Sequence, residues 1–188
     1  DETKGIHDDE RYQTIYAEKM GAIAAPTAGL HFTTNLLQEI SRKGIKIVYI
    51  TLHVGLGTFK PIHTEDLRQH TIHKEFYNIP EETTDTINKA KSLGKKIFAT
   101  GTSTCRVLET IAKNNTTEKS SGWTNLFIYP PYKFKLTDSL ITNFHLQRST
   151  LILLASAFAG RENIATSYEE AISLNYRFYS YGDCMLIL

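Results

Sequence analysis

The pattern of apolar and polar positions alternates between the periods of strands and helices along the chain. Runs of β-branched and apolar residues predict strands over residues 46–54, 75–79, 96–100 and 126–129. Apolar residues at helical spacing predict helices near 8–16, from Thr33 or Thr34 to Gly44, over 81–93, around Val107 to Ile111, over 150–159 and over 168–174. Repeated units of strand, loop and helix are typical of an α/β sandwich. We therefore expect a mainly parallel sheet flanked by helices.

The remaining segments predict loops and a closing hairpin. Residues 22–32 are small, apolar and interrupted by a proline and a glycine, which suits a loop that lines a site. Residues 114–125 are polar and lack periodicity, so we expect a mobile surface loop there. Residues 176–181 and 184–188 predict two strands joined by a Gly-Asp turn. No linker divides the chain, and residues 1–188 are expected to form one α/β domain.

Composition places the chain among ordinary globular proteins. It has 188 residues, of which 41% are hydrophobic and 22% are charged, and these fractions exclude the collagenous and wholly disordered classes. Its 21 Lys and Arg residues against 20 Asp and Glu residues give a net charge of +1. A chain-wide basic footprint for nucleic acid is therefore absent, and a nucleic-acid surface would have to be a local patch.

Cysteine usage and apolar runs favour a cytoplasmic protein. Cys105 and Cys184 lie far apart in apolar surroundings, which predicts neither a disulfide framework nor a close metal-ligand pair. The longest apolar run, 151–160, is far shorter than the roughly 20 residues that a membrane span requires. The chain begins with Asp1 rather than Met, so we expect a processed or dissected piece of a longer protein.

Two glycine-containing loops follow predicted strands, where open α/β sheets bind ligands. Gly55-x-Gly57 resembles the start of a dinucleotide fingerprint, but Lys60 stands in place of the third glycine. That loop is either a ligand loop or a structural tight turn. The segment 101–104 offers hydroxyl groups and free N–H groups at a helix start, either to an anion or simply as an N-cap. Arg106 in the first helical turn opposes the helix dipole, which hints at a carboxylate or phosphate partner.

Histidines and aromatic residues supply further candidate chemistry. Five histidines lie near predicted loops and strand ends, namely His31, His53, His70, His73 and His145. Each is either a hydrogen-bonded structural residue or part of a site, and the spacing of His70 and His73 completes no zinc ligand set. Aromatic residues crowd the last third of the chain beside Lys133, Lys135 and Arg177. Aromatic residues beside cationic ones either bind single-stranded RNA by base stacking or form cross-strand pairs in a core.

Eight ordered motifs are spread over nearly the whole chain. They are 25–32 (APTAGLHF), 52–59 (LHVGLGTF), 101–109 (GTSTCRVLE), 126–130 (LFIYP), 140–146 (LITNFHL), 149–151 (STL), 156–160 (SAFAG) and 176–183 (YRFYSYGD). Together they resemble one family, the S-adenosylmethionine:tRNA ribosyltransferase-isomerase of queuosine biosynthesis. The family pattern is not followed at four positions, which are Leu56, Pro131, Gln147 and Cys184. These departures change the local shape of loops and remove no ionisable group. Family members are nearly twice as long, and their earlier half includes a small β-barrel that this chain is expected to lack.

The resemblance implies an unusual use of S-adenosylmethionine as co-substrate. Its ribosyl carbons are transferred to 7-aminomethyl-7-deazaguanine at the tRNA wobble position, where they rearrange to an epoxycyclopentane while adenine and methionine leave. The implied partners are tRNAs with GUN anticodons and S-adenosylmethionine, with no membrane and no metal, and a monomer is expected. The alternatives are a non-catalytic tRNA-binding module, an inactive fragment of the enzyme, and a generic phosphate-binding α/β enzyme.

The resemblance also implies site residues. The chemistry needs a base beside the sulfonium and an acid for departing adenine, without individual assignment. The expected catalytic residues are His31, His53, His73, Glu75, His145 and Asp183. The expected S-adenosylmethionine ligands are Thr27, Gly55, Gly57, Thr58, Gly101, Thr102, Thr104, Arg106 and Asn143, with Arg106 forming a bidentate fork to the carboxylate. The residues expected to contact RNA are Tyr129, Tyr132, Arg177 and Tyr181.

Overall fold

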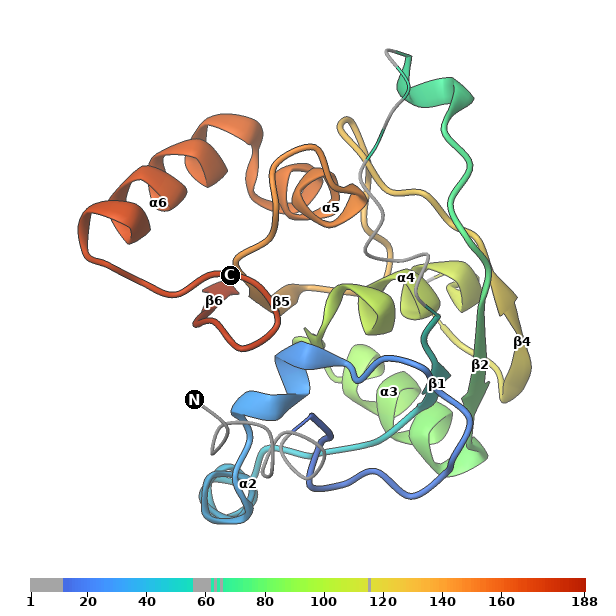
Figure 1. Ribbon diagram of the computed structural model, residues 1–188. Helices are drawn as coiled ribbons and strands as arrows, with labels where there is room; N and C mark the ends of the chain where they lie inside the picture. The colour runs from blue at the N-terminus through green and yellow to red at the C-terminus, as the bar shows by residue number, and fades with distance from the viewer. Residues whose placement is uncertain (1–11, 56–61, 63, 65, 115) are drawn as a thin grey trace.

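The computed structural model describes residues 12–55, 62, 64, 66–114 and 116–188, and Figure 1 shows its elements. The strands are β1 (Thr51–His53), β2 (Glu75–Ile79), β3 (Phe98–Thr100), β4 (Ser120–Thr124), β5 (Ser139–Asn143) and β6 (Cys184–Ile187). The α-helices are α2 (Thr34–Arg42), α3 (Glu81–Ser92), α4 (Thr102–Ile111), α5 (Thr150–Ala159) and α6 (Arg161–Ser173). Two 3₁₀ helices, η1 (Thr27–His31) and η3 (Leu67–Gln69), complete the described elements.

The strands form two small sheets, of which the first is antiparallel and the second is mixed. In the first, β2 lies between β1 and β4 and pairs antiparallel with both. In the second, β5 pairs parallel with β3 and antiparallel with β6. The mixed α/β class is confirmed, but the expectation of a mainly parallel sheet is wrong. Parallel strands need a long crossover connection, and α4 is part of such a connection between β3 and β5. Between β1 and β2, η3 is the sole helix among the described residues, and these two strands pair antiparallel.

Helix α4 is the central element, because it packs against both sheets. Its Val107 and Ile111 contact Tyr77 and Ile79 of β2 in one buried cluster. Its opposite side joins a second cluster that includes Leu140 of β5. This double burial holds the first turn of α4 in a fixed position beside the ends of β3 and β5.

The C-terminal helices complete the fold on the far side of β5. Ser149 caps α5 by accepting a hydrogen bond from the Ile152 N–H at 3.3 Å, as the sequence predicts. Between α5 and α6, Phe144, Ala155 and Tyr168 belong to one buried cluster. This packing anchors the segment that follows β5.

Several predicted boundaries differ because backbone groups find partners outside a strand ladder. Within 46–54 only Thr51–His53 is a strand, and the Tyr49 carbonyl instead accepts a hydrogen bond from Thr83 Oγ1. Residues 126–129 form no strand, since the Leu126 carbonyl accepts from Arg106 Nε. Residues 176–181 form none either, because Tyr179 has a positive φ of 72°.

Other expectations also change at particular places. The segment 12–16 is turn-like rather than helical, and residues 8–11 of that expected helix lie outside the described residues. Strand β4 occupies part of the 114–125 segment expected to be a loop, and its mobility stays a prediction. Helix α6 begins at Arg161 instead of near Tyr168. None of the helices in the described part of the chain is long and apolar enough to cross a membrane.

Candidate functional site

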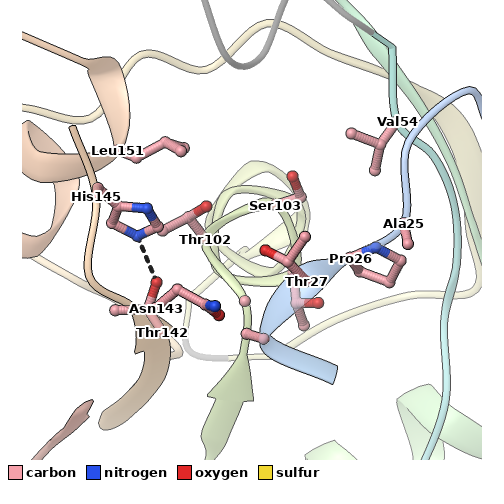
Figure 2. A pocket seen from close by; sticks show the side chains of 13 residues that line it. Ala25, Pro26, Thr27, Val54, Thr102, Ser103, Thr142, Asn143, His145 and Leu151 are labelled. Carbon is pink, nitrogen blue, oxygen red and sulfur yellow. Dashed lines mark hydrogen bonds between the residues drawn. The ribbon is translucent and has the colours of Figure 1, made fainter. Parts of the chain in front are cut away.

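A pocket lies where the first turn of α4 meets the end of β5. It is lined by residues 25–28, Val54, residues 101–104, Thr142, Asn143, His145 and Leu151. Figure 2 shows the end of α4 between the β5 side, with His145 and Leu151, and the η1 side, with Pro26 and Val54. The pocket therefore collects segments that are widely separated in the sequence and sits beside the carboxyl ends of a parallel strand pair, the usual ligand position in α/β folds.

The first turn of α4 presents free donors to this pocket. Gly101 is the N-cap residue, and it has a positive φ of 91° and makes no side-chain cap. Its own N–H donates to the Ile141 carbonyl at 2.8 Å, which ties the helix start to β5. The N–H groups at the start of a helix lack intrahelical acceptors and lie at the positive end of the helix dipole. The pocket wall at Thr102 to Thr104 is thus suited to a negatively charged ligand group.

Asn143 contributes an acceptor on the β5 side. Its Nδ2 donates to the carbonyl oxygens of Tyr179 and Ser180 at 3.0 and 3.3 Å, which fixes the direction of the amide. Its Oδ1 is buried and has no hydrogen-bond partner among the described residues. A buried polar atom without a partner is costly, so a ligand donor at this atom would be favoured.

His145 is the titratable side chain of the pocket lining. Its Nε2 lies 2.7 Å from Thr142 Oγ1, drawn as the dashed line in Figure 2, and its main-chain N–H donates to Tyr168 Oη at 2.8 Å. Burial lowers the pKa of His145 to about 4. Because the charged imidazolium is disfavoured there, His145 is neutral at physiological pH and can accept a proton or a hydrogen bond.

A buried ion pair supports α4 from the side of β2. Arg106 Nη1 lies 2.7 Å from Glu75 Oε2, and the two side chains are 2% and 1% exposed. Ser103, which lines the pocket, donates from Oγ to Glu75 Oε1 at 3.2 Å. Burial lowers the pKa of Arg106, while the charge of Glu75 acts in the opposite direction. This network connects the pocket wall to β2.

With this geometry in place, the comparisons with known proteins identify the family. A family model described as queuosine biosynthesis protein matches residues 2–187. The chain belongs to this family. The resemblance that the sequence motifs indicate is therefore confirmed.

Relatives of the family agree over nearly all of the chain. It is 58% identical to the S-adenosylmethionine:tRNA ribosyltransferase-isomerase of Acetivibrio thermocellus, covering 98% of this chain and 54% of that protein. It is 53% identical to the protein of the same name from Staphylococcus haemolyticus, covering 97% and 54%. The crystal structure of S-adenosylmethionine tRNA ribosyltransferase from Thermotoga maritima matches with a TM-score of 0.72 and 45% identity, covering 86% and 51%. The chain spans about half the length of the curated relatives it matches.

Six residues expected from the family motifs meet in the pocket: Thr27, Gly101, Thr102, Thr104, Asn143 and His145. Of the other expected cofactor ligands, Gly57 and Thr58 lie outside the described residues, and Gly55 follows Val54 without being part of the lining. A bidentate contact of Arg106 with the ligand carboxylate would require its guanidinium to leave Glu75 and the Leu126 carbonyl. Its Nη2 is buried and has no hydrogen-bond partner among the described residues.

The other expected catalytic residues are not part of the pocket lining. His31 ends η1, and its Nε2 is buried without a partner in the described part of the chain. Asp183 Oδ1 lies 2.8 Å from Arg177 Nη2, and its hydrogen bonds from Arg177 lower its pKa. The His53 ring packs on Phe76 of β2, with ring centroids 5.3 Å apart. His73 is exposed just before β2.

The residues expected to contact RNA occupy separate surfaces. Tyr129 packs on Phe127, with ring centroids 4.9 Å apart. Tyr181 packs on Tyr12 at 5.7 Å, on the C-terminal side of the fold. Tyr132 lines a second hollow, and burial raises its pKa to about 12. Arg177, as described above, is paired with Asp183.

Sequence reasoning missed Ser103, Thr142, Val54 and Leu151 as lining residues. All four lie inside the motif stretches 101–109, 140–146, 52–59 and 149–151. The motifs therefore pointed to the right segments, but the types of these four side chains did not mark them as lining residues. For metals, the described residues contain no group of three or more His, Cys, Asp or Glu side chains that could hold an ion.

Proposed function

We propose that the chain transfers and isomerises the ribosyl moiety of S-adenosylmethionine onto 7-aminomethyl-7-deazaguanine at the wobble position of tRNA, with release of adenine and methionine. The observation that carries this proposal is the convergence of the family motifs. Stretches 25–32, 52–59, 101–109, 140–146 and 149–151 each contribute lining residues to the same pocket. A pocket assembled from the motifs of a family is the natural place for its shared chemistry.

The first turn of α4 suits the carboxylate of S-adenosylmethionine. Its N–H groups and the hydroxyl groups of Thr102 and Thr104 can donate hydrogen bonds to this carboxylate. The positive end of the helix dipole also favours a negative charge at this place. Asn143 Oδ1 accepts a hydrogen bond from a donor group of the same molecule. Thr27 approaches from η1, on the opposite wall. The helix start and the amide together orient the ligand relative to His145.

His145 is the proposed group for proton transfer. As a neutral imidazole it can take a proton from the carbon beside the sulfonium, and Thr142 Oγ1 orients its ring through the 2.7 Å contact. Once protonated, the same side chain can pass this proton to departing adenine, so one group can serve the base step and the acid step. Roles for His31, His53, His73, Glu75 and Asp183 stay predictions.

The remaining parts of the proposal concern partners and place of action. The tRNA partner is expected to carry a GUN anticodon, and Tyr129, Tyr132, Tyr181 and Arg177 stay predicted contacts to it. The reaction needs no metal ion or redox cofactor, and we expect a cytoplasmic monomer. The alternative of a tRNA-binding module without catalysis predicts binding of tRNA with no affinity for S-adenosylmethionine.

Adenine release tests the proposal. The chain and the longer Acetivibrio thermocellus relative are incubated with S-adenosylmethionine and tRNA that carries the deazaguanine precursor, and adenine is quantified by chromatography. We expect adenine from both proteins, and its loss by about 100-fold or more in His145→Gln of this chain. Ser167→Ala on the exposed face of α6 is the matched control and should keep full activity. Adenine from the relative alone would show that this chain lacks an essential part, and adenine from neither would favour the binding module.

A further inference from the structure

Three aromatic rings form a row across the first sheet. His53 of β1 is the register partner of Phe76 of β2, and Phe76 is the register partner of Trp123 of β4. The ring centroids are 5.3 Å apart for His53 and Phe76 and 5.5 Å apart for Phe76 and Trp123. Figure 1 shows the three strands side by side. The row crosses the whole width of the sheet.

This row lies on the open face of the sheet. Side chains of a strand alternate between faces, and Glu75 and Tyr77, the neighbours of Phe76, are buried toward α4. Trp123 is 63% exposed, and Lys74, two residues before Phe76 on the same face, is also exposed. An exposed indole within an aromatic row is not explained by core packing, and such surfaces mark binding sites.

One end of the row reaches a second feature. Trp123 is part of the lining of the second hollow, together with Tyr132, Lys133 and Lys135. At the other end, Val54 lines the pocket beside α4, but successive side chains of a strand point to opposite faces, so the row passes outside this pocket. The row thus extends to a hollow that carries two exposed lysines. We call the surface from His53 through Phe76 and Trp123 to Lys133 and Lys135 the aromatic strip.

The charges of the strip favour a polyanion. Lys133 and Lys135 are exposed and form no ion pair among the described residues. The acidic residue of the hollow, Glu109, is buried, and its carboxylate accepts the N–H groups of Lys135, Leu136 and Thr137 at 2.8 to 3.1 Å. Its carboxylate oxygens therefore already accept hydrogen bonds from the main chain, and the side chain is shielded from a ligand in the hollow. Exposed rings beside unpaired lysines are the combination that binds single-stranded nucleic acid.

We propose that the aromatic strip binds an unpaired stretch of the tRNA, with bases stacked on Phe76 and Trp123 and phosphates near Lys133 and Lys135. The inference rests on the proposed function and deepens it, because it assigns the tRNA a contact surface outside the pocket that holds the reacting groups. Single strands suit this surface, since their unstacked bases expose the faces that aromatic side chains contact. The strip contributes tRNA affinity and leaves binding of S-adenosylmethionine to the pocket.

The fluorescence of Trp123 gives a direct test, because it is the only tryptophan in the sequence. We expect tRNA without S-adenosylmethionine to quench this fluorescence in a saturable way as bases stack on the indole. Trp123→Ala should weaken tRNA binding about 5- to 150-fold, measured by filter binding. Phe98→Ala, which removes a half-exposed ring on β3 outside the strip, is the matched control and should leave the affinity unchanged.

Salt dependence tests the lysines. The double variant Lys133→Ala/Lys135→Ala should reduce the slope of log affinity against log salt concentration by about 1.4, which is the loss of two single-strand phosphate contacts. Lys95→Ala/Lys96→Ala, two exposed lysines after α3, should keep the slope. Calorimetric titration with S-adenosylmethionine should give the same affinity for every variant of the strip.

The outcomes separate this inference from the proposed function. Quenching and weakened variants without adenine release would support the strip and overturn the enzymatic proposal. Adenine release with unquenched Trp123 and unchanged affinity in Trp123→Ala would overturn the strip alone. A change in Trp123 fluorescence that follows protein concentration rather than tRNA would show that a second copy of the chain covers the strip, and this too would overturn the inference.

Discussion

Arg106 Nη1 and Glu75 Oε2 lie 2.7 Å apart, with both side chains almost completely buried. The pair joins α4 to β2 across 31 residues of sequence, and Ser103 extends it to the pocket wall. Removing one partner of a buried ion pair leaves an uncompensated charge in a poorly solvated place. The pair therefore holds the helix whose first turn forms the proposed binding site.

Glu75→Gln should lower the free energy of unfolding by about 3 to 5 kcal/mol, because Arg106 would stay buried without its counter-charge. Urea denaturation measures the change. Glu82→Gln on the exposed side of α3 is the matched control and should change it by less than about 0.5 kcal/mol. The double variant Glu75→Leu/Arg106→Met should recover part of the loss. Equal stability of Glu75→Gln and Glu82→Gln would refute the structural role.

Gly101→Ala should cost about 1 to 3 kcal/mol of stability and also weaken S-adenosylmethionine binding. Gly101 has φ 91° and ψ 145°, a backbone conformation essentially confined to glycine, and it positions the first N–H groups of α4. Gly44→Ala is a sharp control, because Gly44 has a φ of 78° and lies after α2, away from the pocket. It should show a similar loss of stability in thermal unfolding with unchanged affinity in calorimetry. Equal loss of affinity in both variants would speak against a local role of Gly101.

His145 should make stability fall in mild acid. Burial lowers its pKa from 6.5 to about 4, so between these values the unfolded chain binds a proton that the folded chain does not. Its contribution is fully present above pH 6.5 and is lost as pH falls toward 4, up to about 3 kcal/mol. The measurement is the free energy of unfolding at pH 7 and pH 4.5 for the parent chain and for His145→Gln. The difference between the two pH values should shrink in His145→Gln.

The control for that experiment is His73→Gln, which alters an exposed histidine before β2. It should keep the full pH dependence of the parent chain. An unchanged acid sensitivity in His145→Gln, or an equal change in His73→Gln, would contradict the assignment of a buried neutral imidazole.

Local sequence signals predicted helices α2, α3, α4 and α5, because their determinants lie within a few residues. Ser149 caps α5 through a hydrogen bond three residues away, and Gly94 follows α3 with a positive φ of 64°. The directions of the strands were not predictable in this way. Strand β4 pairs with β2 through Trp123 and Phe76, which lie far apart in the sequence. A polar segment with a glycine looks like a loop until such a partner is known.

The site shows the same division between local and tertiary causes. The helix start predicted after Gly101 is confirmed, and the structure places residues 101–104 and Asn143 in the lining of one pocket. The sequence motifs do not predict the direction in which each side chain points. Arg106 follows the first turn of α4, but its contact with Glu75 depends on the packing of α4 on β2. The expected place of Arg106 in the first turn is therefore wrong, and the carboxylate beside it belongs to Glu75 of the protein itself.

The most direct test of the account is a crystal structure of the chain with S-adenosylmethionine. We expect the ligand carboxylate within hydrogen-bond distance of the first-turn N–H groups of α4, with Asn143 Oδ1 and His145 contacting the same molecule. Binding at another place on the chain, with no ligand density between α4 and the end of β5, would contradict the assignment of this pocket.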